Sequence, residues 1–471
     1  MPERPAMRSF DLAVIGSGPG GYRAAVLGAL HGLSVAIVEK GQWGGCCLNR
    51  GCVPKKTWHH SAKLMQDARH WSGRGLAGTL SADLELAWHH QKQVVQTVRD
   101  SSVRYLRRLG IALWEGEASL VGPHELAVGG TPAMRARHIL IATGSHPHVP
   151  AVFRGHPDVI LTTDDLFDRL PPHGPRVAVV GSGAVGTEFA FILAMLGRRV
   201  TWLAAEQPLG STAFSQAARK LLSDALAQGG ITPRLGTRIM SIERTAGGIL
   251  LQTAAGTREE VDWVLLGTGR VPHTRGLALD PWGVALDPSG FIPTNEALQT
   301  RLPHVYAIGD VANPRMTANH ALAEASIALA NILRPAARSR ANHAVPRVIH
   351  SAVELASVGL SEDQAEEEGF ETAVGFAAFA TNPRALGQDA PEGFVRLVAD
   401  ADSGKLLGAE VAGNEAGELI HWVAGQLGRA DALQQLSGAF YNHPSRSEEL
   451  QNAAETLAAK WGLHDAMRGP H

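Results

Sequence analysis

Short apolar runs that alternate with alanine-rich stretches are the main hydrophobic pattern of this chain. Residues 11–39 read DLAVIGSGPGGYRAAVLGALHGLSVAIVE, and residues 177–203 read VAVVGSGAVGTEFAFILAMLGRRVTWL. Each segment predicts an apolar strand, a glycine-rich turn, a helix and a second apolar strand. The near-repeat therefore predicts two βαβ units in an α/β protein.

The glycines of both turns have the G-x-G-x-x-G spacing of a dinucleotide site, in which they allow a tight turn, a close approach of the pyrophosphate and close helix packing. The helix that follows offers its free N–H groups to the phosphates. One such match is weak evidence, and a doubly wound sheet without nucleotide is the alternative. Two matches in full context predict two Rossmann-like sites, at Gly16, Gly18, Pro19, Gly20 and Gly21 and at Gly181, Gly183, Val185 and Gly186.

Acidic residues follow the second strand of each unit. Glu39, followed by Lys40, ends the strand VAIVE and can accept a hydrogen bond from a ribose hydroxyl. The alternative is an exposed glutamate at a strand end. In the second unit Glu206 follows the strand, where it would repel a 2′-phosphate, and no arginine cluster stands nearby. We therefore expect NAD(H) rather than NADP(H).

Further apolar strands end in glycine. They are HILIATGS (138–145), VDWVLLGTGR (261–270) and HVYAIGD (304–310), the last followed by a predicted helix over 320–333. Asp310 stands where an acidic group commonly faces a ribityl chain or a phosphate, although a helix N-cap is the simpler alternative.

The cysteines of the chain, Cys46, Cys47 and Cys52, all lie in the segment GGCCLNRGCVPKK. Such clustering indicates local redox or metal chemistry in a reducing compartment rather than a secreted disulfide framework. The sulfurs of Cys47 and Cys52 can meet if the segment forms a distorted first helical turn. A helix N-terminus and the lysines that follow would then favour a reactive thiolate.

A zinc site is the minor alternative for this segment, with His59 and His60 as two further ligands. No second cysteine pair exists, so we expect no metal site. A disulfide between the neighbours Cys46 and Cys47 would be strained, and Cys46 is expected to be a small buried side chain.

Near the C-terminus, YNHPSRSEEL places His443 five positions before Glu448. A histidine oriented by a carboxylate is typical of an acid–base catalyst for thiols. Among 21 histidines a single one means little, and a surface loop is the alternative.

The motifs GSGPGG, GGCCLNRGC, ATGS, GSGAVGTE, TGRVP, YAIGD and HPSRSE occur in this order along nearly the whole chain. In this they resemble the FAD-dependent pyridine nucleotide–disulfide oxidoreductases, the family of dihydrolipoamide dehydrogenase, glutathione reductase and mercuric reductase. The resemblance implies an enzyme with FAD and NAD(H), in which hydride passes from the nicotinamide to the flavin and electrons pass on to the Cys47–Cys52 disulfide. It also implies a homodimer with a C-terminal α+β dimerisation domain.

The resemblance also implies residue roles. Cys52 would face the flavin, Cys47 would attack the substrate, and His443 of the partner subunit, held by Glu448, would move the proton. Glu188 would pair with Lys55 or Lys56 beside the flavin. The further cofactor contacts implied are Gly45, Cys46, Thr143, Gly144, Gly269, Arg270, Gly309 and Asp310.

The substrate is less well indicated. Several segments, such as GAEVAGNEAGELIH, look like dihydrolipoamide dehydrogenase, whereas GCVPKK looks like glutathione reductase. No cysteine follows Cys52, so mercuric reduction is not expected. Arg50, the run TWHH (57–60), Tyr441 and Asn442 are expected to make the surroundings of the disulfide more basic and polar.

We therefore expect the substrate to be a lipoyl group on a specialised carrier protein. An acidic surface on that carrier would be one reason for basic residues around the disulfide. A glutathione-type reductase is one alternative. The other is a flavoprotein subunit that docks on a larger complex or senses redox state.

The resemblance and the length of 471 residues predict four segments. They are an FAD domain (1–150), an NAD(P) domain (151–280), a second part of the FAD domain (281–345) and the dimerisation domain (346–471). A formal net charge of −2 argues against a nucleic-acid or anionic-membrane surface. The start MPERPAMRSF lacks the apolar stretch of a signal peptide, so a cytoplasmic protein is expected.

Overall fold

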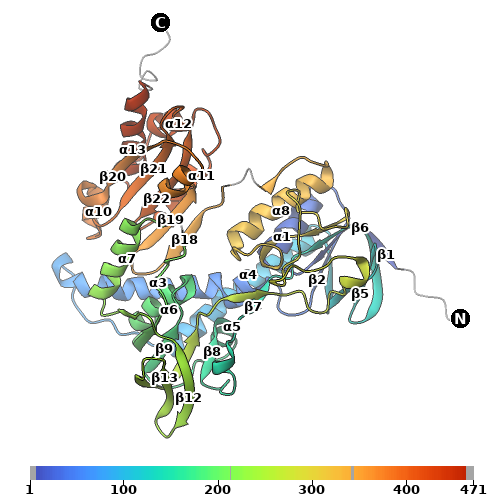
Figure 1. Cartoon of the computed structure of the whole chain (residues 1–471), viewed down its shortest axis with the longest axis horizontal. Coiled ribbons are helices and arrows are strands. Elements are labelled where there is room, and N and C mark those ends of the chain that lie inside the picture. Colours follow the sequence, from blue (N-terminus) through green and yellow to red (C-terminus); the bar gives the residue numbers. More distant parts are fainter. Residues whose placement is uncertain (1–6, 213, 341–343, 463–471) are drawn as a thin grey trace, which may run out of the picture. The chain divides into compact units, whose positions relative to one another are not determined.

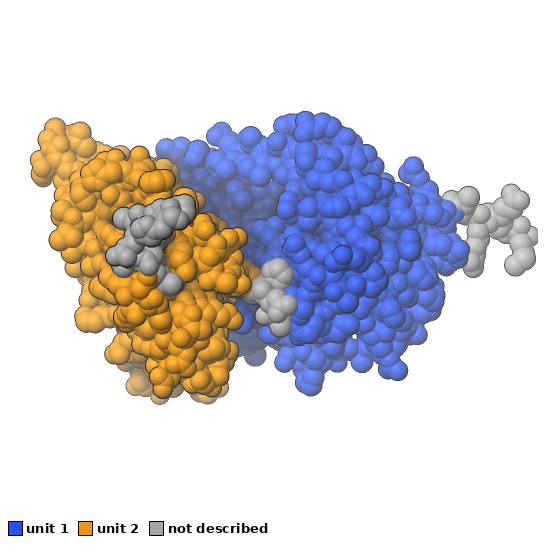
Figure 2. Space-filling model, turned by 90° about the horizontal axis from the view of Figure 1, so that it is seen from above, with its two compact units in different colours: residues 1–58, 83–173, 268–343 blue, residues 59–82, 174–267, 344–471 orange. Residues whose placement is uncertain are grey.

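The computed structural model describes residues 7–212, 214–340 and 344–462 (Figure 1). Residues 1–6, on which part of the expectation about a leader depends, lie outside this range. The chain forms two compact units, coloured separately in Figure 2. Unit 1 comprises residues 1–58, 83–173 and 268–343, and unit 2 comprises residues 59–82, 174–267 and 344–471. The boundary between Trp58 and His59 falls inside helix α3 (Cys52–Asp67).

The large sheet of unit 1 has the strand order β3-β2-β1-β6-β5-β4, and β17 pairs with β6. Its strands are β1 (Arg8–Ile15), β2 (Val35–Glu39), β3 (Ala112–Glu115), β4 (Ala118–Gly122), β5 (Glu125–Val128), β6 (Thr131–Ile141) and β17 (Val305–Ala307). β1 runs parallel to β2 and β6, and β17 runs parallel to β6. Both Ile15 and Ala307 pair with Ile141, so the carboxyl ends of β1, β6 and β17 lie at one edge of the sheet.

Alternate residues of β1 enter two different cores, as the period of a strand requires. Leu12 and Val14 face a core shared with helices α1 (Pro19–Leu30) and α8 (Ala318–Leu333). Ala13 and Ile15 face the opposite core. Burial on both faces explains why this strand reads as a continuous apolar run. The remaining elements of unit 1 include α2 (Gly45–Arg50), α4 (Leu84–Arg108), α5 (Thr163–Asp168), β7 (Ser145–Pro147), β8 (Ile160–Thr162) and β16 (Arg270–Pro272).

Unit 2 contains the second predicted βαβ unit, formed by β9 (Arg176–Val180), α6 (Ala184–Met195) and β10 (Arg199–Leu203). These strands lie in a parallel sheet in the order β11-β10-β9-β15, with β11 at Pro233–Arg234 and β15 at Trp263–Leu266. Helix α7 (Gln216–Gln228) and an antiparallel sheet of β12 (Ile239–Thr245), β13 (Gly248–Thr253) and β14 (Arg258–Val261) complete this part.

The C-terminal part of unit 2 is an antiparallel sheet in the order β18-β19-β22-β21-β20. Its strands are β18 (Arg347–His350), β19 (Glu354–Gly359), β20 (Thr372–Ala378), β21 (Phe394–Asp400) and β22 (Leu406–Ala412). Helices α11 (Ala416–Ala424), α12 (Ala432–Gly438) and α13 (Glu448–Ala458) share its apolar core (Figure 1). Two short helices, α9 (Glu362–Glu367) and α10 (Pro383–Gly387), connect the strands.

The predicted α/β fold with two βαβ units and a C-terminal α+β domain is confirmed. The exact boundaries of the four segments stay predictions. Among the described residues, no helix is long and apolar enough to cross a membrane.

Candidate active site

The redox segment folds as the spacing of its cysteines predicts. Helix α2 ends at Arg50, Gly51 interrupts the helical path, and α3 begins at Cys52. Cys47 and Cys52 form a disulfide across this break, with their Cα atoms 4.8 Å apart. That separation lies within the usual Cα–Cα range of disulfides. Cys46 is a free thiol, and it is half-buried rather than the buried side chain that was expected.

The redox segment lies directly against the first glycine-rich turn. A Cβ atom added to Gly45 would come within 2.6 Å of the Cα atom of Gly18. In addition, the backbone N–H of Gly44 donates to Oγ of Ser17 at 2.9 Å. The disulfide is therefore built beside the loop that is predicted to hold a dinucleotide.

Glu39 closes the first turn from the end of β2. Its Oε2 accepts from the N–H and the hydroxyl of Ser17 at 3.0 and 2.6 Å, and its Oε1 accepts from the N–H of Gly41 at 2.8 Å. A carboxylate has about four acceptor positions, so it can still accept from a ribose hydroxyl. Ser17 lies between the predicted glycines, and sequence reasoning missed its role. The neighbouring residues are placed as expected: Pro19 begins α1, and Gly20 is buried against Ala321 of α8.

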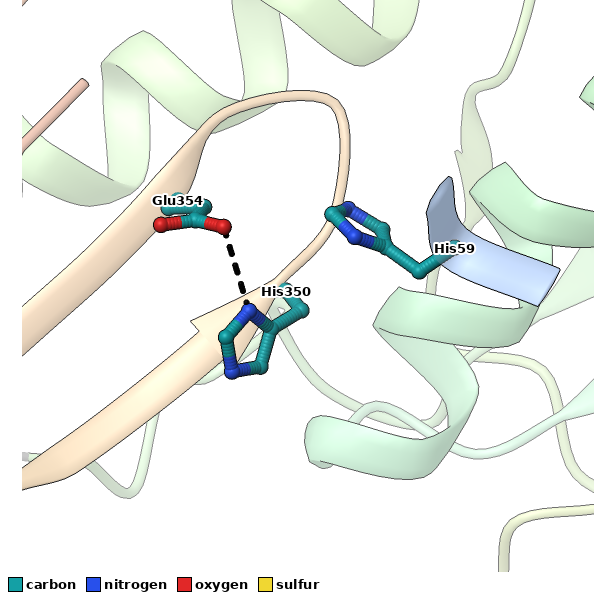
Figure 3. Close-up of side chains that lie close together, drawn as sticks. All are labelled: His59, His350 and Glu354. Atoms are coloured by element: carbon teal, nitrogen blue, oxygen red, sulfur yellow. Dashed lines mark hydrogen bonds and ion pairs between the residues drawn. The ribbon is translucent and has the colours of Figure 1, made fainter. Parts of the chain in front are cut away.

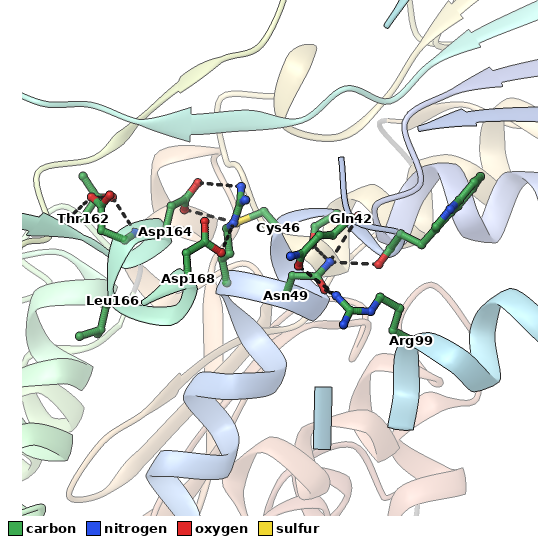
Figure 4. A network of polar contacts seen from close by, with 12 residues as sticks. Gln42, Cys46, Asn49, Arg99, Thr162, Asp164, Leu166 and Asp168 are labelled. Atoms are coloured by element: carbon green, nitrogen blue, oxygen red, sulfur yellow. Dashed lines mark hydrogen bonds and ion pairs between the residues drawn. The ribbon is translucent and has the colours of Figure 1, made fainter. Parts of the chain in front are cut away.

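Arg50 does not add free positive charge near the disulfide, so that expectation is wrong. Its Nε donates to Asp168 of α5 at 2.8 Å, and its Nη1 lies 3.8 Å from Asp164. Asp164 also lies 3.9 Å from the Sγ of Cys46 (Figure 4). Burial raises the pKa of the Cys46 thiol to about 11, so this thiol stays protonated near neutral pH. The two aspartates could not be identified from sequence, because they stand more than a hundred residues away.

The expected polar run at residues 57–60 is also largely buried. Trp58 is fully buried and its Nε1 donates to the carbonyl of Ala87 at 3.0 Å, and His59 is 7% exposed. Only His60 of this run is exposed. Burial lowers the pKa of His59 to about 4, so its imidazole is neutral near pH 7.

A second contact network holds α2 from its other side. Asn49 is buried and donates to the carbonyls of Trp43 and Gly45, at 3.0 and 2.8 Å. Its Oδ1 accepts from Arg99 of α4 at 3.0 Å (Figure 4). The redox helix is thus held by α4 as well as by α5, which the sequence did not indicate.

Ser145 is the point where two predicted residues meet. Its hydroxyl donates to Oδ2 of Asp310 at 2.6 Å and accepts from Nε of Arg270 at 2.7 Å. Burial raises the pKa of Asp310, while these neighbours oppose the rise. The alternative that Asp310 caps helix α8 is wrong, because the N-cap of α8 is Thr317.

Other predicted residues of this region are held by local hydrogen bonds. Thr143 donates to the carbonyl of His273 at 2.6 Å, and the carbonyl of Gly144 accepts from the N–H of His273 at 2.8 Å. The N–H of Gly309 donates to Glu324 at 2.7 Å. Lys40 lies 2.7 Å from Nε2 of His273 and 3.2 Å from Glu117, so it belongs to a local cluster that was not predicted. The carbonyl of Gly269 accepts from the N–H of His148 at 3.0 Å.

The second glycine-rich turn, in unit 2, is more open. Gly183 is exposed, and Val185 lies in the first turn of α6. Glu206 is exposed three residues beyond β10. Arg234 of β11 pairs with Leu203 at the end of β10, but its guanidinium forms an ion pair with Glu259. That arginine is therefore already neutralised, which agrees with a preference for NAD(H).

Glu188 of α6 is buried and accepts from the backbone N–H of His350 at 2.8 Å. Lys56 is exposed and Lys55 is half-buried, and both lie in unit 1, whereas Glu188 lies in unit 2. The pairing of Glu188 with one of these lysines stays a prediction.

His443 and Glu448 are brought together as predicted. Nδ1 of His443 lies 2.8 Å from Oε1 of Glu448, and Oε2 of Glu448 accepts from the N–H of Ser445 at 2.7 Å. The Ser445 N–H and the imidazole lower the pKa of Glu448. The imidazole is well exposed, with its Nδ1 occupied and its Nε2 available. The preceding Tyr441 is anchored by a bond from its hydroxyl to the carbonyl of Leu436 at 2.9 Å, and Asn442 is exposed.

Comparison with known families gives two matches. Residues 10–325 match the model of the pyridine nucleotide-disulphide oxidoreductases, and residues 345–454 match the dimerisation domain of the same group. The chain is 37% identical to dihydrolipoyl dehydrogenase of Thermus scotoductus, over 96% of this chain and 98% of that protein. It is 33% identical to glutathione reductase of Burkholderia cepacia, over 94% of this chain and 96% of that protein.

Solved structures agree with the fold. LpdA from Mycobacterium tuberculosis superposes with a TM-score of 0.89 over 96% of this chain and 100% of that one, at 24% identity. The flavoprotein disulfide reductase RclA from Escherichia coli, solved as a Cu(II) complex, gives a TM-score of 0.83 over 96% of this chain and 100% of that one, at 25% identity.

Proposed function

Because the chain belongs to the pyridine nucleotide-disulphide oxidoreductase family, we propose that it passes electrons between a lipoyl dithiol and NAD(H) through FAD and the Cys47–Cys52 disulfide. As a member of this family, the chain is a flavin-dependent disulfide oxidoreductase that uses FAD and NAD(H), and it resembles dihydrolipoamide dehydrogenase. The observation that carries the proposal is the disulfide built against the first dinucleotide turn.

The residues of both turns fit the two cofactors. Among the described residues, no atom beyond the adjacent residues and the local helix backbone lies within 4 Å of a Cβ added to Gly18 or Gly183, so a pyrophosphate can approach the backbone at both. Glu39 has acceptor capacity left for a ribose, and Asp310 stands at the same sheet edge. When bound, FAD supplies the two-electron relay between nicotinamide and disulfide.

The residue roles in the proposal are those that the family resemblance implies. In the proposal, Cys52 faces the flavin and Cys47 exchanges with the substrate disulfide. His443 of the partner subunit accepts and returns the thiol proton through Nε2, since Glu448 holds Nδ1. The match to the dimerisation domain supports a homodimer as the active unit.

The lipoyl substrate is supported by the relatives named dihydrolipoyl dehydrogenase, which include the 37% identical protein. A carrier with an acidic surface now has less support, because Arg50 is neutralised by Asp164 and Asp168. Lys56 and His60 are exposed basic residues of the predicted polar segment.

A panel of steady-state assays tests the substrate. Purified holoenzyme is given free dihydrolipoamide, lipoylated carrier domains or glutathione disulfide, each with NAD(H) and NADP(H). We expect turnover of lipoyl substrates with NAD(H). Robust turnover of glutathione disulfide alone would overturn the lipoyl proposal and support the second candidate, a glutathione-type reductase. That candidate rests on Lys55 and on the 33% identical glutathione reductase.

Variants test the mechanism. Cys47→Ser should abolish turnover while the flavin stays bound. His443→Asn should lower kcat by about 10²- to 10⁴-fold, the usual contribution of a general acid–base. His421→Asn, which changes an exposed histidine of α11, is the matched control and should leave kcat unchanged. Unchanged turnover in Cys47→Ser would refute the thiol mechanism. Full biological function of that variant would favour a docking or redox-sensing subunit.

A further inference from the structure

A histidine and carboxylate cluster lies in unit 2, and none of its three side chains has a role in the proposed electron transfer. His59 comes from α3, His350 ends β18, and Glu354 begins β19 (Figure 3). One ligand atom from each of these side chains can be chosen so that all lie within 4.8 Å of one another. The ring of His59 points toward the other two residues from the neighbouring helix.

The spacing within the cluster suits a small metal ion. Nδ1 of His350 lies 3.2 Å from Oε1 of Glu354. Bonds of about 2.0–2.1 Å to a tetrahedral Zn²⁺ put neighbouring ligand atoms about 3.3 Å apart. An ion can therefore replace the proton between these two groups with little movement. Oε2 of Glu354 already accepts from the N–H of Gly417 at 3.2 Å, which orients the carboxylate.

His59 has the surroundings of a preoriented ligand. Its Nε2 lies 3.0 Å from the carbonyl oxygen of Ser351. A carbonyl can only accept, so Nε2 carries the proton and Nδ1 keeps a free lone pair. Histidines that bind metals almost always donate their other N–H to a carbonyl or a carboxylate in this way.

The turn that carries the other two ligands is also anchored. The N–H of His350 donates to Oε1 of Glu188 at 2.8 Å, and the hydroxyl of Ser351 donates to the carbonyl of Thr187 at 3.2 Å. Both partners belong to α6. A site supported by such second contacts holds its ligands near the geometry that binding requires.

We propose that His59, His350 and Glu354 bind one divalent transition-metal ion of the Zn²⁺ class, with water in the fourth position. Two imidazoles and one carboxylate suit zinc, whereas Mg²⁺ and Ca²⁺ prefer oxygen ligands alone. The bound ion joins α3, the helix that begins at Cys52, to the β18–β19 hairpin. Without such an ion, the same residues would be an ordinary ion pair beside a buried histidine.

Zinc titration of the oxidised FAD holoenzyme tests the site. The enzyme is kept oxidised because free thiols of Cys47 and Cys52 would also chelate zinc. Isothermal titration with ZnCl₂ should show one tight equivalent per chain. The variants His59→Leu, His350→Phe and Glu354→Gln should each weaken this equivalent at least tenfold. His60→Ala, which removes the adjacent exposed histidine, and His124→Ala, from the stacked pair of His124 and His304, should leave it unchanged.

A second measurement needs no variant. Co²⁺ added to the wild-type oxidised holoenzyme should give the visible absorption bands of a four-coordinate Co²⁺ ion, and Zn²⁺ should displace the Co²⁺.

Before the zinc titration, each variant is checked for its flavin spectrum and thermal unfolding. No tight equivalent in the wild type, its retention in all three ligand variants, or its loss in His60→Ala would overturn the proposal. None of these outcomes depends on the identity of the disulfide substrate.

Discussion

The two glycine-rich turns have the same backbone packing but different surroundings. A Cβ added to Gly21 would lie 1.9 Å from the carbonyl oxygen of Gly16, and one added to Gly186 would lie 2.1 Å from that of Gly181. The first turn, however, is covered by Gly45 of the redox segment and closed by Glu39. The second turn has an exposed Gly183 and an exposed Glu206 beyond its strand.

The difference teaches how one motif can serve two kinds of cofactor. A covered turn built into its surroundings suits a group that stays bound, whereas an open turn suits one that enters and leaves at each turnover. We therefore propose that the resident FAD binds at the first turn and that the exchanging NAD(H) binds at the second. The following changes test this assignment.

The largest effect is expected at the covered turn. Gly21→Ala places a methyl group against a backbone carbonyl, which cannot move as a side chain can, and should cost about 3 kcal/mol or more of unfolding free energy. Little FAD-loaded protein should be recovered, as measured by flavin per chain and Tm. Gly18→Ala is the control: it has room in the described structure and should fold, but bind FAD more weakly. Equal FAD content in Gly21→Ala and the wild type would contradict the assignment.

The equivalent change at the open turn should separate the two cofactors. Gly186→Ala should raise the KM for NADH at least tenfold, because the helix that meets the pyrophosphate is displaced. FAD content should stay near one per chain, since the first turn is untouched. Gly183→Ala should also raise the KM, but without lowering Tm. Loss of FAD from Gly186→Ala would show that the two turns have been assigned the wrong way round.

A smaller effect is expected from charge at the open turn. Glu206→Arg replaces a group that repels a 2′-phosphate by one that attracts it. A favourable exposed charge pair contributes about 1 kcal/mol, so the ratio of kcat/KM for NADPH to that for NADH should rise about fivefold or more. The gain should shrink at high salt, because exposed charges are screened. A ratio that does not respond to the substitution would mean that Glu206 points away from the ribose.

The smallest effect concerns the pH dependence of stability that Asp310 contributes. Asp310 follows β17, at the same sheet edge as the first turn. Burial raises the pKa of Asp310 above its ordinary value of 3.8, so the folded protein holds this proton more tightly than the unfolded chain does. Stability of the flavin-free protein is therefore lost as pH rises through the folded pKa. Asp310→Asn removes this loss, so its Tm should exceed that of the wild type near neutral pH and approach it near pH 3.8. A constant difference in Tm across this range would contradict the argument.

Much of the site could be predicted because its signals are local. The glycine spacing, the Cys47–Cys52 pair and the His443–Glu448 pair each depend on residues within a few positions of one another. Arg50 shows where such reasoning stops: its charge is plain in the sequence, but the aspartates that neutralise it lie on α5. The prediction of polar surroundings from residues 57–60 was wrong for a similar reason, because Trp58 and His59 are buried by distant segments.

The sequence by itself determined the two βαβ units, the place of the redox disulfide and the family, because strand and helix periodicity and turn chemistry act between near neighbours in the chain. Only the tertiary structure decided that Ser145 joins Asp310 to Arg270 and that His59 meets His350 and Glu354. These contacts depend on which strands become neighbours in a sheet and on which helix packs beside them. The arrangement of strands and helices is set by the packing of the whole core, so no short stretch of sequence specifies it.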